Sequence, residues 1–151
     1  MGHARCILSL FLLACHSGAP APVSVSSGRL ASVGCYVLSW TGAHPAFPDT
    51  IALLSDSSAK AQETMHERGA RQVALTSAQL AKYGWWTYYW VPIDSDSVRV
   101  EETDGFNGTV LLARLTADSL VGTASVFTDV VGALPKREFL FVARRARCLG
   151  L

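Results

Sequence analysis

Residues 109–128 read TVLLARLTADSLVGTASVFT, two apolar runs separated by a short polar stretch. The runs 109–115 and 120–128 have the length and residue types of β-strands, and the residues 116–119 between them are turn formers. A strand, a short turn and a second strand predict an antiparallel hairpin. This hairpin is the clearest structural signal in the chain.

Six further β-type runs flank the hairpin, each bounded by turn signals. The run 97–103 alternates Val98 and Val100 with the charged Arg99 and Glu101, as a strand with one buried face does. The other five runs are residues 35–40, 50–54, 71–75, 85–91 and 138–147. About eight strands with short connections predict an all-β fold, a small antiparallel up-and-down barrel.

β-type patterns become sparse between the second and fourth predicted strands. Thr76 and Gln79 have the spacing of a helix capping box, and Gly84 suits the residue after a helix end. The segment 77–83 is therefore a candidate for a two-turn helix, and 59–67 is a weaker one. The expected fold is a barrel with one short helical insertion.

The N-terminus has the order of features found in a signal peptide. One fixed positive charge in residues 1–5 precedes the apolar run 6–14, which is far shorter than the ~20 residues that span a bilayer. Residues 12–15, Leu-Leu-Ala-Cys, resemble the lipobox of bacterial lipoproteins, in which the peptide is cut before the cysteine and the thiol is acylated. The resemblance implies a lipoprotein signal peptide over residues 1–14 and a lipid on Cys15. A buried first strand and plain secretion without a lipid are the alternatives.

The remaining chain divides into a linker and one domain. Residues after Cys15 and up to 33 are rich in Ser, Ala, Pro, Gly and Val, which predicts a flexible tether over 15–33. The barrel domain is expected over residues 34–151, and 151 residues suffice for one domain. His16 follows the lipobox cysteine in place of Asp, which by resemblance to the usual sorting pattern indicates the outer membrane of the bacterial envelope. A secreted or periplasmic protein is the alternative.

Two cysteines frame the predicted strands, Cys35 at the start of the first and Cys148 after the last. An even pair in an exported protein indicates a disulfide, and a disulfide requires Cα atoms within about 7 Å of each other. The first and last strands must then lie side by side, as they do in a closed barrel, which has no open sheet edges. A β-sandwich whose termini meet is the alternative. A metal site is a poorer use of the cysteines because no Cys-x-x-Cys and no histidine pair accompanies them.

Three segments resemble small bacterial lipoproteins with a calycin-like barrel: residues 34–36 (Gly-Cys-Tyr), 115–123 and 143–148. A looser similarity to lipocalins concerns the first strand. In that family the strand begins with Gly-x-Trp, and an arginine from the final strand packs across the ring. The resemblance implies that Tyr36 takes the place of the tryptophan in this chain and that Arg145 or Arg147 is its partner.

The most unusual side-chain cluster is aromatic and comprises Trp85, Trp86, Tyr88, Tyr89 and Trp90. On a strand, Trp86, Tyr88 and Trp90 face one way, while Trp85 and Tyr89 face the other. One set is expected to fill the barrel interior, and the other to lie under segment 57–84, on a partner or at a membrane surface. Trp86, Tyr88 and Trp90 are the candidate ligand-binding residues. Packing without any ligand is the alternative for all five.

Other kinds of chemistry have little support. A net charge of +1 without a basic face argues against a nucleic-acid partner. His16, His44 and His66 have no companion at i+2 or i+4, so no metal is predicted. The acidic residues between the fourth predicted strand and the hairpin are interpreted as solvated charges: Asp94, Asp96, Glu101, Glu102 and Asp104.

Motifs of enzymes are also missing from the sequence, which has no nucleophile elbow, phosphate loop or zinc-protease helix. We therefore expect a protein that is not an enzyme and has no cofactor. The leading hypothesis is a lipid-anchored barrel that takes a small apolar or amphiphilic ligand. The rival is a structural or interaction module of the envelope with a filled barrel. The oligomeric state is not predicted.

Overall fold

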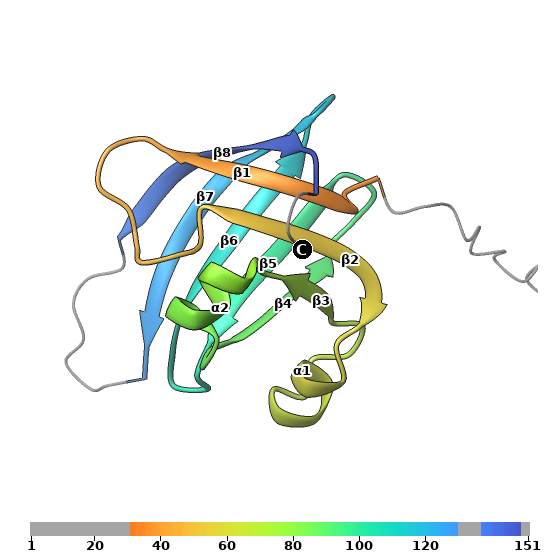
Figure 1. Ribbon diagram of the computed structural model, residues 1–151, viewed down its shortest axis with the longest axis vertical. Coiled ribbons are helices and arrows are strands. Elements are labelled where there is room, and N and C mark those ends of the chain that lie inside the picture. Colours follow the sequence, from red (N-terminus) through yellow and green to blue (C-terminus); the bar gives the residue numbers. More distant parts are fainter. Residues whose placement is uncertain (1–30, 130–136, 149–151) are drawn as a thin grey trace, which may run out of the picture.

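The computed structural model describes residues 31–129 and 137–148, and these form one closed barrel (Figure 1). Eight strands follow one another around it in sequence order, and each pairs antiparallel with its neighbours. The strands are β1 (Gly34–Trp40), β2 (Thr50–Ser57), β3 (Arg71–Ala74), β4 (Thr87–Pro92), β5 (Ser97–Thr103), β6 (Asn107–Leu115), β7 (Ser119–Thr128) and β8 (Glu138–Ala146). The predicted up-and-down barrel is confirmed, and the sandwich alternative is wrong.

The barrel closes where β8 lies against β1. The register along this seam runs from Cys35 opposite Ala146 to Trp40 opposite Phe141. A disulfide between Cys35 and Cys148, whose Cα atoms lie 5.3 Å apart, links the two strands at one end of the seam. The predicted disulfide is therefore confirmed, and it lies where barrel closure requires it.

Two helices interrupt the strands, where one short insertion is predicted. Helix α2 (Ser77–Tyr83) has the predicted bounds and the complete capping box, in which Gln79 N–H donates to the Thr76 hydroxyl over 3.3 Å. Helix α1 (Ala59–Thr64) is shorter than its candidate segment. It ends early because His66 adopts φ 52°, which a right-handed helix does not accommodate.

The two ends of the barrel are built from different segments (Figure 1). One end, which we call the base, carries the disulfide, the turn between β4 and β5 and the turn between β6 and β7. The opposite end, which we call the mouth, carries the β1–β2 loop (residues 41–49), helix α2 and the turn between β5 and β6. The connection between β3 and β4, residues 75–86, contains α2.

Arg145 and Tyr36 close the base. The Arg145 guanidinium lies 5.4 Å from the centre of the Tyr36 ring, and its Nη2 donates to the Tyr36 hydroxyl oxygen over 2.9 Å. Arg145 is thus the residue that contacts Tyr36, rather than Arg147. Gly34 adopts φ 152°, and a Cβ there would lie only 2.9 Å from Arg145 Nη1, so glycine leaves the room that this packing needs.

The last residues of the predicted tether belong to the base. The Tyr36 hydroxyl donates to the carbonyl oxygen of Ser32 over 2.9 Å, and Arg145 donates to the carbonyl oxygens of Ala31 and Val33 over 2.6 and 3.1 Å. Residues 31–33 therefore belong to the folded domain, which was predicted to begin at residue 34. The predicted signal peptide (1–14), Cys15 and the earlier part of the tether lie outside the described residues.

Apolar side chains from all eight strands meet inside the barrel. Trp90 and Tyr36 are the largest of the fully buried ones. They pack with Leu38, Ile51, Leu53, Val73, Val98, Val100, Leu111, Ala113, Leu120, Ala124, Phe141 and Ala143. The expected alternation of inward apolar and outward polar residues therefore builds the core beneath the mouth.

The aromatic cluster divides between three environments. Trp90 lies in the core with Tyr88 packed against it, and Tyr89 is buried on the outer face against Ala61 of α1. The predicted strand start at residue 85 is wrong, because β4 begins at Thr87. Trp86 N–H donates to the Tyr83 carbonyl oxygen over 3.1 Å, which continues the turn after α2 and keeps this backbone out of the sheet.

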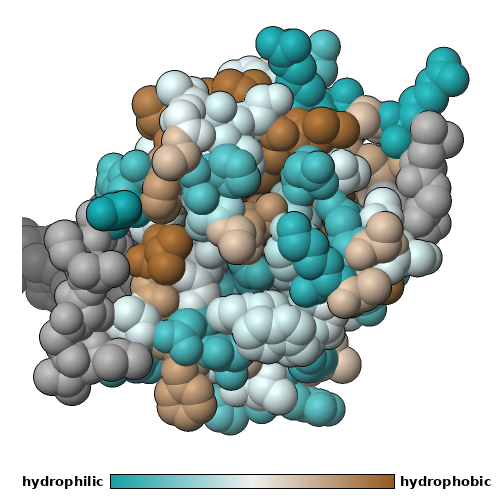
Figure 2. Space-filling view, turned by 60° about the vertical axis from the view of Figure 1, so that its left-hand side comes forward, coloured by the Kyte–Doolittle hydropathy of each residue, from teal (hydrophilic) through white to brown (hydrophobic). Residues whose placement is uncertain are grey.

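The outer surface of the barrel wall carries both hydrophobic and hydrophilic side chains. Val37, Leu112, Val121 and Leu140 are exposed on β1, β6, β7 and β8. On the face that Figure 2 presents, hydrophobic side chains form separate groups among hydrophilic ones. In residues 31–129 and 137–148, no helix has the length and apolarity to cross a membrane.

The core position of Trp90 makes a prediction about stability. Trp90 is 0% exposed and its Nε1 donates to the Leu54 carbonyl oxygen over 2.9 Å, whereas Trp85 is 67% exposed. Trp90→Ala should lower the free energy of unfolding by ~3–5 kcal/mol, because it leaves a cavity. Trp85→Ala should change it by only about 0.5 kcal/mol. Urea unfolding measures both; equally small losses would mean that β4 is not embedded in a barrel wall.

Candidate functional site

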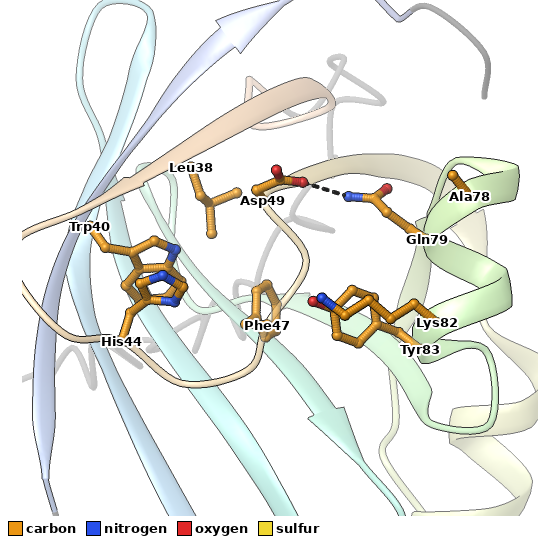
Figure 3. Close-up of a pocket in the computed structure, with 9 residues that line it drawn as sticks. All are labelled: Leu38, Trp40, His44, Phe47, Asp49, Ala78, Gln79, Lys82 and Tyr83. Atoms are coloured by element: carbon orange, nitrogen blue, oxygen red, sulfur yellow. Dashed lines mark hydrogen bonds between the residues drawn. The ribbon is translucent and has the colours of Figure 1, made fainter.

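A pocket of about 560 Å³ opens at the mouth between β1, the β1–β2 loop and α2 (Figure 3). Pockets that bind small molecules usually have volumes of ~300–1,000 Å³. The mouth pocket is lined by Leu38, Trp40, His44, Phe47, Asp49, Ala78, Gln79, Lys82 and Tyr83. It is the candidate functional site.

One side of the mouth pocket is apolar. Leu38 and Trp40 are successive inward-facing residues of β1, so the strand itself places them at the pocket. Phe47 reaches in from the loop and is 3% exposed. Its ring meets that of Trp40 edge-on at 6.4 Å and that of Tyr88 at 6.2 Å. Phe47 thus belongs to both the pocket lining and the packed core.

The β1–β2 loop is folded so that Phe47 points inward. Phe47 N–H donates to the Pro45 carbonyl oxygen over 2.9 Å, which forms a tight turn. Leu38 N–H donates to the Asp49 carbonyl oxygen over 2.7 Å, which fixes the far end of the loop against β1. Pro45 is buried, as is Pro48 on the other side of Phe47. The loop is thus part of the pocket wall.

A histidine covers one aromatic ring of the mouth pocket. The His44 ring stacks on the Trp40 indole, with centroids 5.2 Å apart and planes inclined by 12°. His44 Nδ1 lies 2.8 Å from the Pro45 carbonyl oxygen, which holds the imidazole in this orientation. The stack fixes the indole ring at the pocket edge.

The side of the mouth pocket formed by α2 is polar. Gln79 Nε2 donates to Asp49 Oδ1 over 3.0 Å, so the capping side chain of the helix also ties α2 to the β1–β2 loop. Lys82 and Tyr83 extend together toward Phe47 (Figure 3). The Lys82 ammonium lies 4.8 Å from the centre of the Tyr83 ring. Contact with Tyr83, and secondarily the charge of Asp49, raises the pKa of Lys82, so this side chain is a cation at neutral pH.

The sequence-predicted ligand residues lie elsewhere. Trp90 is in the core and Tyr88 is below Phe47, while Trp86 lies in the turn after α2 with its ring 4.3 Å from that of Trp85. None of Trp86, Tyr88 and Trp90 lines the mouth pocket. Ligand binding by these three residues stays a prediction.

Glu102 is a buried carboxyl in the barrel interior. It continues the inward series of Val98 and Val100 and is 3% exposed, so its interpretation as a solvated charge is wrong. The Tyr88 hydroxyl donates to Glu102 Oε1 over 2.6 Å. Burial raises the pKa of Glu102, although hydrogen bonds from Tyr88 and Thr109 act in the opposite direction. Because inward and outward residues alternate along β5, the sequence already indicated that Glu102 faces the interior with Val98 and Val100.

Comparison of the chain with models of protein families, with curated proteins and with solved structures gave no match. Across the part of the chain that the structure describes, no three His, Cys, Asp or Glu side chains gather as metal ligands would. The assignment of function therefore depends on the mouth pocket.

The buried Glu102 predicts a pH dependence of stability. Its folded-state pKa is raised above the ordinary value of 4.5, so the folded state binds the proton more tightly than the unfolded chain does. The free energy of unfolding of the wild type should therefore rise, relative to Glu102→Gln, as the pH falls from about 7 to about 5. Glutamine keeps an oxygen that can accept from Tyr88. Urea unfolding of both proteins measures the difference; a difference independent of pH would contradict a raised pKa of Glu102.

Proposed function

We propose that this protein is a non-enzymatic binding protein of the bacterial envelope that takes a small amphiphilic ligand in the mouth pocket. The observation that carries the proposal is the composition of the pocket. Leu38, Trp40 and Phe47 form an apolar side, and residues of α2 form a polar side opposite. An amphiphile has both kinds of surface.

Each side of the mouth pocket contributes to binding differently. The apolar side removes a hydrocarbon or ring surface from water, which stabilises the complex by about 25 cal/mol per Å² of buried apolar area. The polar side orients the ligand through hydrogen bonds and charge. Leu38 and Phe47 belong both to the pocket lining and to the packed core, so a ligand in the mouth pocket would lie on the filled interior of the barrel.

The proposed location is outside the cytoplasm, with a lipid on Cys15 holding the protein at the outer membrane. The Cys35–Cys148 disulfide supports export, because disulfides persist in oxidising compartments. The lipobox resemblance of residues 12–15 supports the anchor. A secreted or periplasmic protein without the lipid is the alternative.

An interaction module is the second candidate function. The barrel interior below the mouth pocket is packed with side chains from all eight strands. Val37, Leu112, Val121 and Leu140 are exposed on the outer wall. These observations fit a barrel that meets another envelope protein through its wall, with no ligand at the mouth.

Filling the mouth pocket should separate these two functions. The neutral fluorophore N-phenyl-1-naphthylamine should bind the folded protein, and Ala78→Trp should weaken binding about tenfold or more, a loss of about 1.4 kcal/mol, because the new ring occupies the pocket. Ala81→Trp is the matched control, since Ala81 is an exposed residue of α2 outside the pocket lining. Fluorescence titration gives both affinities. Equal binding by both variants and the wild type would mean that the mouth pocket is not the binding site.

The anchor is tested in cells. Metabolic labelling with an alkyne fatty acid should tag the wild type, and Cys15→Ser should abolish the tag because the acylated thiol is gone. The Cys6→Ser variant serves as control and should keep the tag, since Cys6 lies in the predicted signal peptide. Labelling that survives Cys15→Ser would contradict the lipoprotein assignment.

A further inference from the structure

Large apolar side chains are exposed to water at the mouth of the barrel. Leu80 of α2, Trp85 after that helix and Phe106 in the β5–β6 turn are 53, 67 and 68% exposed. Trp86 is half-buried, and its ring lies 4.3 Å from that of Trp85. We call these four residues the rim. Among the tryptophans and phenylalanines that the structure describes, only Trp85 and Phe106 are exposed, and both lie at the mouth.

The turns that carry the rim lie next to each other. Thr87 opposes Thr103 in the β4–β5 ladder, so the segments just beyond these residues, 85–86 and 104–106, leave adjacent strands at the same end. Leu80 lies one helical turn before Trp85, and its carbonyl oxygen accepts from Gly84 N–H over 2.8 Å. Figure 1 shows α2 and the β5–β6 turn together at this end of the barrel. The rim is therefore one apolar border of the mouth.

Hydrogen bonds hold the β5–β6 turn in the shape that exposes Phe106. The Asp104 carboxylate accepts from the N–H groups of Phe106 and Asn107 over 2.8 and 2.7 Å, and Gly105 adopts φ 100°. Asp129 N–H donates to the Phe106 carbonyl oxygen over 2.8 Å, which ties the turn to the end of β7. The fixed backbone keeps the ring in contact with water. Covering such an apolar surface would be favourable.

A lipid bilayer fits the size and composition of the rim. Its exposed apolar surface is on the order of 400 Å², about half of the ~800 Å² that each partner of a stable protein interface buries. Tryptophan rings favour the head-group level of a membrane, and leucine and phenylalanine insert slightly deeper. Lys82 and Asp104, which flank the rim in the sequence, have opposite charges and can stay at the polar level. Shallow insertion therefore suits the rim better than a protein partner.

The chain before the barrel is long enough to bring the mouth to the membrane. Fifteen residues separate Cys15 from Ala31, whose carbonyl oxygen accepts from Arg145 at the base. A chain of this length spans up to about 50 Å when it is extended. The ten residues of β7, the longest strand, rise only about 33 Å. A domain tethered in this way is held at a high local concentration near its membrane, so a small apolar rim suffices to seat it.

From these observations we infer that the rim docks onto the bilayer to which Cys15 anchors the chain, so that the mouth pocket opens toward the lipid head groups. The inference uses the proposed anchor but requires no ligand, and in this respect it goes beyond the proposed function. Leu80 belongs to the same short helix as the pocket residues Ala78, Gln79 and Lys82. Docking therefore places the pocket entrance at the level of a membrane where amphiphiles lie.

Quenching by brominated lipids tests this placement. The full chain is bound to phosphatidylcholine vesicles whose acyl chains carry bromine, which quenches tryptophan emission at close range. The wild type should lose emission relative to vesicles without bromine. Trp85→Phe should remove most of that loss, because phenylalanine keeps the rim apolar but does not report at this wavelength. Residues 1–14 contain no tryptophan, so the predicted signal peptide contributes nothing to the signal.

Serine variants assign the contact to one end of the barrel. Phe106→Ser should weaken docking roughly tenfold and lower the quenching, because a large apolar side chain is lost from the contact. Ile93→Ser is the matched control, since Ile93 is 57% exposed in the β4–β5 turn at the base, and it should be quenched as the wild type is. Both positions are exposed, so both variants should unfold in urea at nearly the wild-type midpoint.

The outcomes separate this inference from the proposed function. Unquenched emission from protein that stays on the vesicles would overturn docking of the rim and leave the anchor and ligand binding intact. Equal effects of Phe106→Ser and Ile93→Ser would overturn it as well, because the contact would not be at the mouth. A dimer in solution that Phe106→Ser dissociates, without quenching, would assign the rim to a second copy of the chain. If the wild type does not associate with vesicles, both this inference and the proposed anchor are wrong.

Discussion

The pairing of β1 with β8 is the constraint on which the rest of the structure depends. It converts an eight-strand sheet with two open edges into a barrel with none. The contact joins segments more than a hundred residues apart, so its loop entropy is large. The Cys35–Cys148 disulfide, with a separation of 113 residues, offsets that entropy by about 4–5 kcal/mol in the loop-closure model. Arg145 adds hydrogen bonds to Tyr36 and to the backbone of residues 31 and 33 at the same end.

The same seam fixes the mouth pocket. Because side chains alternate along β1, its inward residues run from Tyr36 at the base through Leu38 to Trp40 at the mouth. Packing at the base therefore sets which residues the pocket receives from the strand. The pocket also needs α2, which is tied to the β1–β2 loop through Gln79 and Asp49. One side chain thus caps the helix and positions the polar side of the pocket.

Local patterns in the sequence predicted the elements well. The hairpin of β6 and β7, the bounds of α2 and the disulfide all follow from turn residues, a capping box and cysteine placement. At two positions, local patterns in the sequence conflicted with each other, and the prediction followed the wrong one. The aromatic run suggested a strand from residue 85, but the helical turn after α2 takes in Trp86. Charge suggested that Glu102 is solvated, but the alternation of β5 turns it inward. The mouth pocket could not be predicted, because β1, a loop and α2 meet only through the tertiary fold.

Amide hydrogen exchange measured residue by residue by NMR tests the closed barrel most directly. β6 and β7 form the longest paired register and provide the internal reference. If β8 closes the barrel against β1, the hydrogen-bonded amides of both strands along the seam should be protected to within about tenfold of those in the β6–β7 ladder, because all of them open only with global unfolding. If the seam amides exchange several orders of magnitude faster while the β6–β7 ladder stays protected, the barrel is open at the seam, and the pairing of β1 with β8 is not what fixes the mouth pocket.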